Sequence, residues 1–427
     1  MSIGIDFADL GIDPVYVPAE PGAAVAEPRG RNLEAGSVLA KTLYSVWSGA
    51  PVTVVNSPPG AGKTTLVTEI VAHLKERTDL RIVIESPTKR GAHDLAGRIA
   101  AELGPDYEGN PQVALSVRQM DPPAGASKGG TEDGGRNIPV VRTVASCRMS
   151  PPECDLIIID EAYQVTFSDA AASADQARQI LLVGDPGQIG PVITADVTAF
   201  RGRETAPHMR APEVFSRMEG AAVHALENTF RVGAATVEAI APLYDFEFGS
   251  LRPDRHLLDA DGDEVPEILS LEVPVAATFD SLDTLVRVAR CASEMIGREL
   301  VEFAADGTES RRVLEAADVA VVVAHNAQSS GIAAILHAMH IEGVMVGTAD
   351  KMQGGQWQAV IALDPCVGYV TAGSHQLSPG RLCVMASRHM THLTWIHDGG
   401  WEAALSTPEA DPAEAALGLE VRRVLTA

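Results

Sequence analysis

The most informative segment for the fold is residues 51–76, PVTVVNSPPGAGKTTLVTEIVAHLKE. It opens with a short β-branched run, which predicts a strand, and residues 64–76 have the apolar spacing of a helix. The loop between them, SPPGAGKTT at 57–65, carries Gly60 and Gly62, which let the backbone approach oxygen atoms. The helix that follows directs the positive end of its dipole at the same place. This order of strand, glycine loop and helix predicts a phosphate-binding loop at the start of an α/β unit.

The side chains of this loop are typical of a nucleotide site. Lys63 is placed to reach the β- and γ-phosphates, and Thr64 is placed to bind Mg²⁺. Ser57 stands where such loops usually have their first glycine. A glycine turn with an incidental lysine is the alternative, but the strand before it and the helix after it favour the phosphate site. The residues expected to hold the nucleotide are Pro59, Gly60, Ala61, Gly62, Lys63, Thr64 and Thr65.

A second segment, DLIIIDEA at 155–162, is an apolar strand that ends in two carboxylates. Asp160 is expected to hold Mg²⁺ through water, and Glu161 to orient or deprotonate an attacking water. For this segment alone, ordinary capping acids would be the favoured interpretation. Behind a phosphate loop in the same sheet, the pair instead predicts hydrolysis of a nucleoside triphosphate by positioning and electrostatics.

Apolar runs alternate with helical segments through most of the chain. The predicted strands lie at 51–56, 81–86, 155–160, 179–185, 318–325, 343–348 and 359–364, and the predicted helices at 32–47, 64–76, 90–103, 329–339 and 412–425. Continuous apolar strands between helices imply parallel sheets covered on both faces, so the fold class is α/β with two blocks of similar size. Residues 121–137 predict a mobile loop, and the acidic segment 251–275 has no assignment. We expect the helix at 412–425 to pack on its own domain.

Composition limits the class of protein and its partners. The 427 residues include 33 Lys+Arg and 57 Asp+Glu, a formal net charge of −24, which argues against nonspecific coating of nucleic acid but allows a basic groove. No apolar run is long enough to span a membrane, and the acidic N-terminus does not resemble a secretory signal, so the expected location is the cytoplasm. The five cysteines lack CxxC spacing, which favours buried free thiols over a zinc site or disulfides.

Several further segments, in order along the chain, resemble the motifs of superfamily 1 helicases. They are ESPTKRGAHDLAGRI (85–99), VVRTVASC (140–147), DEAYQ (160–164), VGDPGQIGPV (183–192), LENTFRVG (226–233), AHNAQSSGIAAIL (324–336), VGTADKMQGGQWQAVIAL (346–363) and RLCVMASRHMTHLTWI (381–396). The resemblance covers roughly residues 50–398 and is closest to branch 1B, which contains the nonsense-mediated-decay RNA helicase and generally moves 5′→3′. It implies two tandem RecA-like P-loop domains with ATP and Mg²⁺ in the cleft between them.

The resemblance also implies roles for residues outside the phosphate loop. Gln188 would sense the γ-phosphate, and Arg231 and Arg388, from the second block, would stabilise the charge of phosphoryl transfer. Surface ion pairing is the alternative for both arginines. The further nucleotide-binding residues are Gln353, Gly355 and Gln356. The catalytic set is therefore Lys63, Glu161, Gln188, Arg231 and Arg388.

Four hydroxyl residues fall in family segments that hold the backbone of a nucleic-acid strand: Ser86, Thr88, Thr143 and Thr348. Such groups position a strand without reading its sequence, although a helix cap or turn is an equal alternative for each. Aromatic residues are only 4 % of the chain, so we do not expect a long base-stacking platform, and Trp357 and Trp395 are expected in the core.

The sequence also departs from the family pattern. Gln356 replaces a glutamate, Gly190 a proline, and Ser387 and His389 alter the usual Thr-Arg-Ala. The span 32–50 has no glutamine to read adenine, so the preference for ATP comes from the resemblance alone.

The predicted organisation has an N-terminal arm (1–30), a first RecA-like domain (31–228), a second (229–400) and a C-terminal tail helix (401–427). The leading hypothesis is an ATP-driven motor on single-stranded nucleic acid, either a helicase or a translocase without large accessory domains. The alternative is a nucleotide-switched ATPase subunit of a larger defence or repair assembly, with a protein partner. A P-loop kinase would not need the second, arginine-bearing block.

Overall fold

The first parallel sheet carries the phosphate loop. The computed structural model describes residues 31, 33–129, 138–200, 202–304, 306–407 and 409–427. The predicted arm (1–30) and residues 130–137 of the predicted loop 121–137 therefore lie outside the described residues. The strands of this sheet, in spatial order, are β4 (Ser127–Lys128), β3 (Ala114–Leu115), β5 (Val140–Thr143), β2 (Ile82–Ser86), β6 (Cys154–Asp160), β7 (Ala177–Gly184), β1 (Val52–Asn56) and β8 (Ala222–Ala225). Each of these pairings is parallel.

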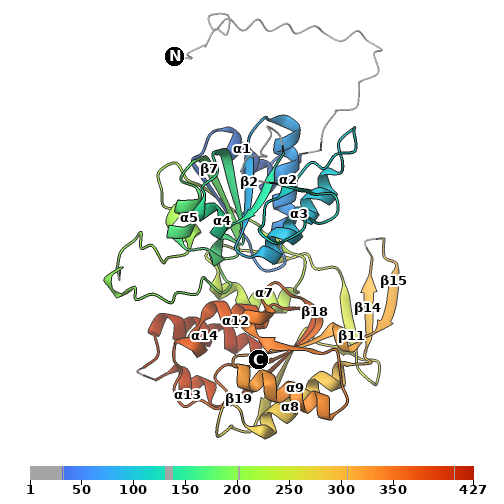
Figure 1. Cartoon of the computed structure of the whole chain (residues 1–427). Coiled ribbons are helices and arrows are strands. Elements are labelled where there is room, and N and C mark those ends of the chain that lie inside the picture. The colour runs from blue at the N-terminus through green and yellow to red at the C-terminus, as the bar shows by residue number, and fades with distance from the viewer. Residues whose placement is uncertain (1–30, 32, 130–137, 201, 305, 408) are drawn as a thin grey trace, which may run out of the picture. The chain divides into compact units, whose positions relative to one another are not determined.

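Two groups of helices pack on the first sheet (Figure 1). They are α1 (Val38–Trp47), α2 (Lys63–Arg77) and α3 (Lys89–Leu103) in one group, and α4 (Val144–Met149), α5 (Phe167–Ser173) and α6 (Ala211–Phe215) in the other. The second group covers a core of strand side chains that includes Val54, Ile157 and Ile159. The apolar faces of the strands are buried beneath helices, as the sequence predicts for a parallel sheet.

The second sheet is also parallel. Its strands, in spatial order, are β13 (Ile268–Val273), β19 (His389–Asp398), β18 (Trp357–Leu363), β16 (Val319–Val323) and β17 (Met345–Thr348). The elements packed around it are α7 (Ala234–Ile240), α8 (Leu282–Met295), α9 (Asn326–Ala338), α10 (Ala349–Met352), α11 (Ser374–Leu377), α12 (Pro379–Ala386), α13 (Trp401–Leu405) and α14 (Pro412–Leu425). The buried side chains of α8 and α9 form one core cluster, and those of α7, α12 and α14 form another with Trp395. The predicted α/β class with two tandem RecA-like domains is confirmed.

The helix predicted at 412–425 packs on the second sheet, as expected. Its Val421 and Leu425 are fully buried in the cluster shared with α7 and α12. Arg422 is also fully buried, and its Nε lies 2.8 Å from Oδ2 of Asp364, at the end of β18. A buried charge needs such a partner, so this ion pair fixes the helix against the sheet.

A small antiparallel sheet was not predicted. Its strands, in spatial order, are β12 (Glu264–Val265), β11 (Arg255–Leu258), β14 (Glu299–Phe303) and β15 (Glu309–Val313). A separate parallel pair is formed by β9 (Asn228–Thr229) and β10 (Gly249–Ser250). The strands are short, and every residue of β15 is exposed, so they lack the apolar runs by which the parallel strands were recognised. The unassigned segment 251–275 supplies the whole of β11, β12 and β13.

The predicted buried free thiols are confirmed, because all five cysteines are free and buried. No described helix has both the length and the apolar character needed to cross a membrane, and no group of three or more His, Cys, Asp or Glu residues among the described residues could hold a metal ion.

Glu85 is a buried carboxylate in the middle of the first sheet. It is paired in register with Arg142 of β5, and neither of its oxygens has a hydrogen-bond partner of good geometry among the described residues. Burial raises the pKa of Glu85 to about 7, against the lowering influence of Cys147, Ser173 and Arg142. The carboxyl group therefore keeps its proton to a higher pH in the folded chain than in the unfolded chain.

We expect the substitution Glu85→Gln to stabilise the chain more at pH 8 than at pH 5. Between the ordinary glutamate pKa and about 7 the folded chain binds the extra proton, so its stability falls as the pH rises. The glutamine variant has no carboxyl group to deprotonate, so its free energy of unfolding should rise relative to that of the wild type by about 2–3 kcal/mol between pH 5 and pH 8. Urea unfolding at both pH values measures this free energy, with the exposed Glu153→Gln as control. An equal difference at pH 5 and pH 8 would contradict the prediction.

Candidate nucleotide site

The phosphate loop adopts the conformation that its glycines allow. Gly60 and Gly62 have φ values of 76° and 83°, in the left-handed region, and α2 begins directly after them. A Cβ on Gly60 would lie 2.3 Å from Cβ of Arg231, so this position also needs glycine for a close approach. The loop is tied to the segment after β8, because Thr229 Oγ1 donates to the carbonyl of Pro59 (2.6 Å) and Phe230 N to that of Gly60 (3.0 Å).

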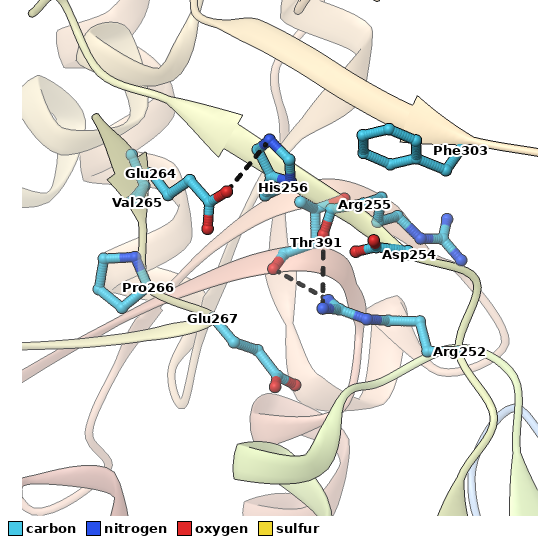
Figure 2. A pocket seen from close by; sticks show the side chains of 10 residues that line it. All are labelled: Arg252, Asp254, Arg255, His256, Glu264, Val265, Pro266, Glu267, Phe303 and Thr391. Carbon is cyan, nitrogen blue, oxygen red and sulfur yellow. Dashed lines mark hydrogen bonds and ion pairs between the residues drawn. The ribbon is translucent and has the colours of Figure 1, made fainter. Parts of the chain in front are cut away.

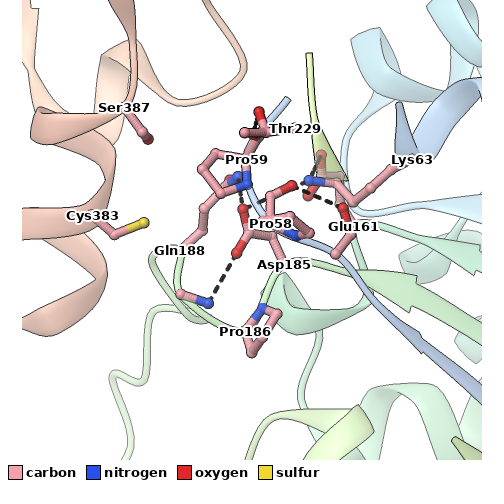
Figure 3. Close-up of polar contacts among 12 residues, drawn as sticks. Pro58, Pro59, Lys63, Glu161, Asp185, Pro186, Gln188, Thr229, Cys383 and Ser387 are labelled. Atoms are coloured by element: carbon pink, nitrogen blue, oxygen red, sulfur yellow. Dashed lines mark hydrogen bonds and ion pairs between the residues drawn. The ribbon is translucent and has the colours of Figure 1, made fainter. Parts of the chain in front are cut away.

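Lys63 lies between two carboxylates. Its Nζ is 3.7 Å from Glu161 Oε1 and 4.0 Å from Asp185 Oδ2, as Figure 3 shows. The pairing in register of Asn56 with Gly184, and of Asp160 with Val183, brings the ends of β1, β6 and β7 to the same edge of the sheet. The lysine and the acids that sequence analysis assigned to phosphate and metal are therefore neighbours.

Asp160 and Glu161 are adjacent but differ in environment. Asp160 is buried, and burial together with the neighbouring Glu161 raises the pKa of Asp160 to about 7, although Lys63 opposes the shift. Glu161 has a φ of 56°, which turns the backbone sharply after the strand, and its side chain is about one third exposed. A cation bound beside a buried carboxylate and a second acid stabilises the ionised form of both groups. With the Thr64 hydroxyl at the cavity wall, the oxygen ligands fit Mg²⁺.

A cavity of about 410 Å³ joins the residues of the two sheets. The sequence-predicted residues that line it are Gly60, Ala61, Gly62, Lys63, Thr64, Thr65, Glu161, Gln188, Arg231, Gln356 and Arg388. Four other predicted residues do not line the cavity: Pro59, Asp160, Gln353 and Gly355. Pro59 accepts from Thr229, Gln353 Nε2 lies 3.4 Å from Gln188 Oε1, and the carbonyl of Gly355 accepts from Arg388.

The two arginines face this cavity without a carboxylate partner among the described residues. Arg388 is 1 % exposed, donates to Gly355 O (3.5 Å) and Ser387 Oγ (3.2 Å), and has a buried Nε with no partner. Arg231 donates to Gln356 Oε1 (3.1 Å) and Ser387 O (3.4 Å). Burial lowers the pKa of both, and the nearby Arg388 also helps to lower that of Arg231, to about 9.

These contacts disfavour surface ion pairing as the role of the two arginines. They also give the departures from the family pattern a structural role. Ser387 contacts both guanidinium groups, and Gln356 holds Arg231. Two guanidinium groups held together in a cavity, with neutral partners only, suit an anion.

A buried hydrogen-bond network joins the two halves of the site. Asp185 accepts from Gln188 Nε2 (2.6 Å), from Gly187 N (2.9 Å) and from the hydroxyl of Tyr244 (2.9 Å). Burial raises the pKa of Asp185. Helix α12 approaches the same loop so closely that a Cβ on Gly380 would lie 2.7 Å from Gln188 O. The conformation around Gln188 is thus coupled to residues that follow β9 and β18.

A second cavity, of about 560 Å³, lies beside the small antiparallel sheet (Figure 2). One of its lining residues, Glu267, accepts from Gly233 N (2.6 Å) and Thr236 Oγ1 (2.6 Å) at the start of α7, and its Oε1 lies 3.5 Å from His389 Nε2. Burial alone would raise the pKa of Glu267, but His389 and Thr236 outweigh it and lower the pKa to about 2. Glu267 thus contacts Gly233, two residues after Arg231, and His389, the residue after Arg388.

The four predicted strand-binding residues follow or end strands at the carboxyl edges of the two sheets. Ser86 and Thr143 are paired in register at the ends of β2 and β5, and Thr348 ends β17. Thr88 Oγ1 accepts from Gly91 N (3.0 Å) and Thr143 Oγ1 from Ser146 N (3.3 Å), so both hydroxyls cap helices. Their contact with nucleic acid stays a prediction.

Sequence reasoning missed five residues at or beside the nucleotide site. Arg98 of α3 and Gly354 line the cavity, and Phe230, which is 52 % exposed, is hydrogen-bonded through its backbone to the phosphate loop. Asp185 and Tyr244 make the network around Gln188. Gly354 and Phe230 are next to predicted residues in sequence and Asp185 lies three positions before Gln188, whereas nothing local distinguishes Arg98 or Tyr244.

Comparison with known proteins matched part of the chain. A family model described as an AAA domain matches residues 40–246. The RecBCD enzyme subunit RecD of Mycolicibacterium smegmatis is 27 % identical over 232 residues, which are 51 % of this chain and 40 % of that protein. The chain therefore spans well under half of this relative.

Two solved structures are also similar in part. The PRRSV helicase has 16 % identity and a TM-score of 0.42, over 83 % of this chain and 54 % of that one. The Arterivirus nonstructural protein 10 (helicase) has 17 % identity and a TM-score of 0.46, over 85 % and 63 %.

The matched region, 40–246, includes the phosphate loop, Asp160, Glu161 and Gln188. The family match and the similarity to RecD confirm the resemblance of this chain to superfamily 1 helicases. Its assignment to branch 1B stays a prediction.

Proposed function

We propose that this chain is an ATP-driven motor on single-stranded nucleic acid. The observation that carries the proposal is the cavity in which Lys63, Thr64 and Glu161 of the first block face Arg231 and Arg388 of the second. A nucleotide that needs groups from both blocks is hydrolysed when the blocks close on it, and repeated closing and opening can move a strand. We take the blocks to be 31–228 and 229–400.

Each residue has a role in this cycle. Lys63 and the loop amides bind the phosphates, and Thr64 and Asp160 would hold Mg²⁺, which neutralises charge on the phosphate oxygens. Glu161 orients the attacking water and accepts its proton. Arg231 and Arg388 stabilise the charge that develops on the transferred phosphoryl group. Gln188 then transmits the change through Asp185 to Tyr244.

Two further assignments complete the nucleotide and strand sites. We assign the exposed ring of Phe230 to stacking on the nucleotide base, since its backbone is bonded to the phosphate loop and no adenine-reading glutamine was found. Ser86, Thr88, Thr143 and Thr348 are assigned to the strand backbone, and the direction of movement to 5′→3′. We expect the motor to act in the cytoplasm.

A second candidate function is an ATPase subunit of a larger assembly. The similar RecD is by name a subunit of the RecBCD enzyme, and this chain matches only 40 % of it. The net charge of −24 also fits a chain that leaves part of strand binding to a partner. In that case ATP would switch a protein contact, in DNA repair for example, and unwinding would be incidental.

The ATP hydrolysis rate with and without short single-stranded DNA and RNA tests the leading proposal. We expect at least a tenfold stimulation by one of them at low salt. No stimulation together with no binding of either strand would refute the motor. Affinity capture with ATP and the Glu161→Gln variant then tests the alternative, which requires a partner that binds without nucleic acid.

A further inference from the structure

Four aromatic rings gather outside the nucleotide site, although the chain has only 9 Phe, 6 Tyr and 4 Trp. We call Phe279, His325, Tyr369 and His375 the ring cluster. The ring centres of His325 lie 4.6 Å from His375, 4.7 Å from Phe279 and 5.8 Å from Tyr369. Phe279 and Tyr369 are nearly parallel, at 19°, and the Tyr369 hydroxyl lies 2.9 Å from His325 Nε2. All four rings are partly exposed.

The ring cluster lies at the carboxyl edge of the second sheet. His325 follows β16 by two residues and precedes α9, and Tyr369 lies in the turns that follow β18. The neighbour of β16 is the edge strand β17, which ends at Thr348. Thr348 is one of the residues predicted to contact a nucleic-acid strand. Ligands of parallel α/β sheets bind in the crevice outside the carboxyl ends of the strands, so the rings occupy the favoured edge.

A cation with unused hydrogen-bonding capacity adjoins the rings. Arg381 Nη1 donates to His375 O (3.1 Å) and Nη2 to Asp350 Oδ2 (3.4 Å), while its buried Nε has no partner among the described residues. His375 Nδ1 is also buried without a partner there. Burial and the nearby Arg381 lower the pKa of both histidines, so their rings are neutral at pH 7. Asp280, near Tyr369, is the other acid that acts on the cluster.

We propose that the ring cluster binds the bases of single-stranded nucleic acid, with Arg381 beside it for a backbone phosphate. The neutral rings offer π faces to any base, and a guanidinium at their rim contributes charge without reading sequence. This inference rests on the proposed function and adds to it the site at which the second block holds its strand. A short cluster is consistent with the low aromatic content, which excludes only a long platform.

The test measures binding of a 12-nucleotide DNA or RNA strand to the full chain, with and without bases at the central positions. The wild-type chain should bind the intact strand about tenfold more tightly than the abasic strand. The double variant Phe279→Ala, Tyr369→Ala should bind both strands equally, because only stacking distinguishes them. Tyr107→Ala removes a ring that is 96 % exposed elsewhere and should behave as the wild type.

The outcomes separate this inference from the proposed function. If the wild-type chain binds strands but the double variant keeps the full tenfold preference for bases, the ring cluster is not the site, while the motor survives. If no strand binds or stimulates hydrolysis, the proposed function fails first. If the double variant does not fold, photo-crosslinking of an iodouracil strand to the wild-type chain tests whether the ring cluster contacts the strand. Crosslinks at Tyr369 or His375 support the site, and crosslinks confined to other segments overturn it.

Discussion

Replacing Arg388 by glutamine should slow ATP hydrolysis about a thousandfold while the nucleotide still binds. An arginine that stabilises phosphoryl transfer contributes about 10³–10⁵ to the rate. Arg388 is 1 % exposed, reaches the cavity that holds Lys63, and has no acid to neutralise among the described residues. Glutamine keeps much of the buried volume and removes the charge. Single-turnover hydrolysis and equilibrium nucleotide binding separate the two effects.

The matched control for this substitution is Arg423→Gln. Arg423 lies on α14, its side chain is 64 % exposed, and its ion pair with Glu402 is at 3.9 Å. Surface pairs of this kind contribute little, so hydrolysis should be unchanged. Retention of more than a tenth of the rate by the Arg388 variant would mean that the second sheet does not complete the site.

The local parts of the nucleotide site could be predicted from sequence. The phosphate loop and the pair Asp160–Glu161 are set by a few consecutive residues between a strand and a helix, and such signals survive in a single chain. Thr88 and Thr143 are also local, and for them the sequence left cap and strand contact open. The structure puts both hydroxyls at helix caps.

The parts that join distant segments could not be predicted. Glu267 braces residues on either side of it in sequence, Gly233 and His389, and it lies in the segment that had no assignment. Tyr244 reaches Asp185, 59 positions earlier. Such contacts depend on how elements distant in sequence pack together, which no periodicity records. The antiparallel strands were missed because short, exposed strands carry no apolar run.

The charges around the cavity explain why a nucleotide would complete it. Lys63 interacts with Glu161 and Asp185, while Arg231 and Arg388 have only neutral partners among the described residues. A triphosphate with its metal would give the lysine and arginines their anion and Asp160 its cation. The binding energy is thereby linked to the distance between the two sheets, which is what a motor requires.

The variant Glu161→Gln should lose about 10²–10⁴ in hydrolysis rate, because the amide cannot accept the proton of the attacking water. It should still bind ATP, since Lys63 loses one carboxylate partner at 3.7 Å and is freer to contact phosphate. Hydrolysis in a single turnover and ATP binding by calorimetry measure the two quantities.

The control Glu153→Gln, at an 81 % exposed side chain, makes the same chemical change outside the site and should leave both quantities unchanged. A variant that neither binds ATP nor hydrolyses it would assign Glu161 to nucleotide binding instead. A variant with the wild-type rate would leave the attacking water to another base, and Asp185, with Oδ2 4.0 Å from Lys63 Nζ, is the next carboxylate near this lysine among the described residues.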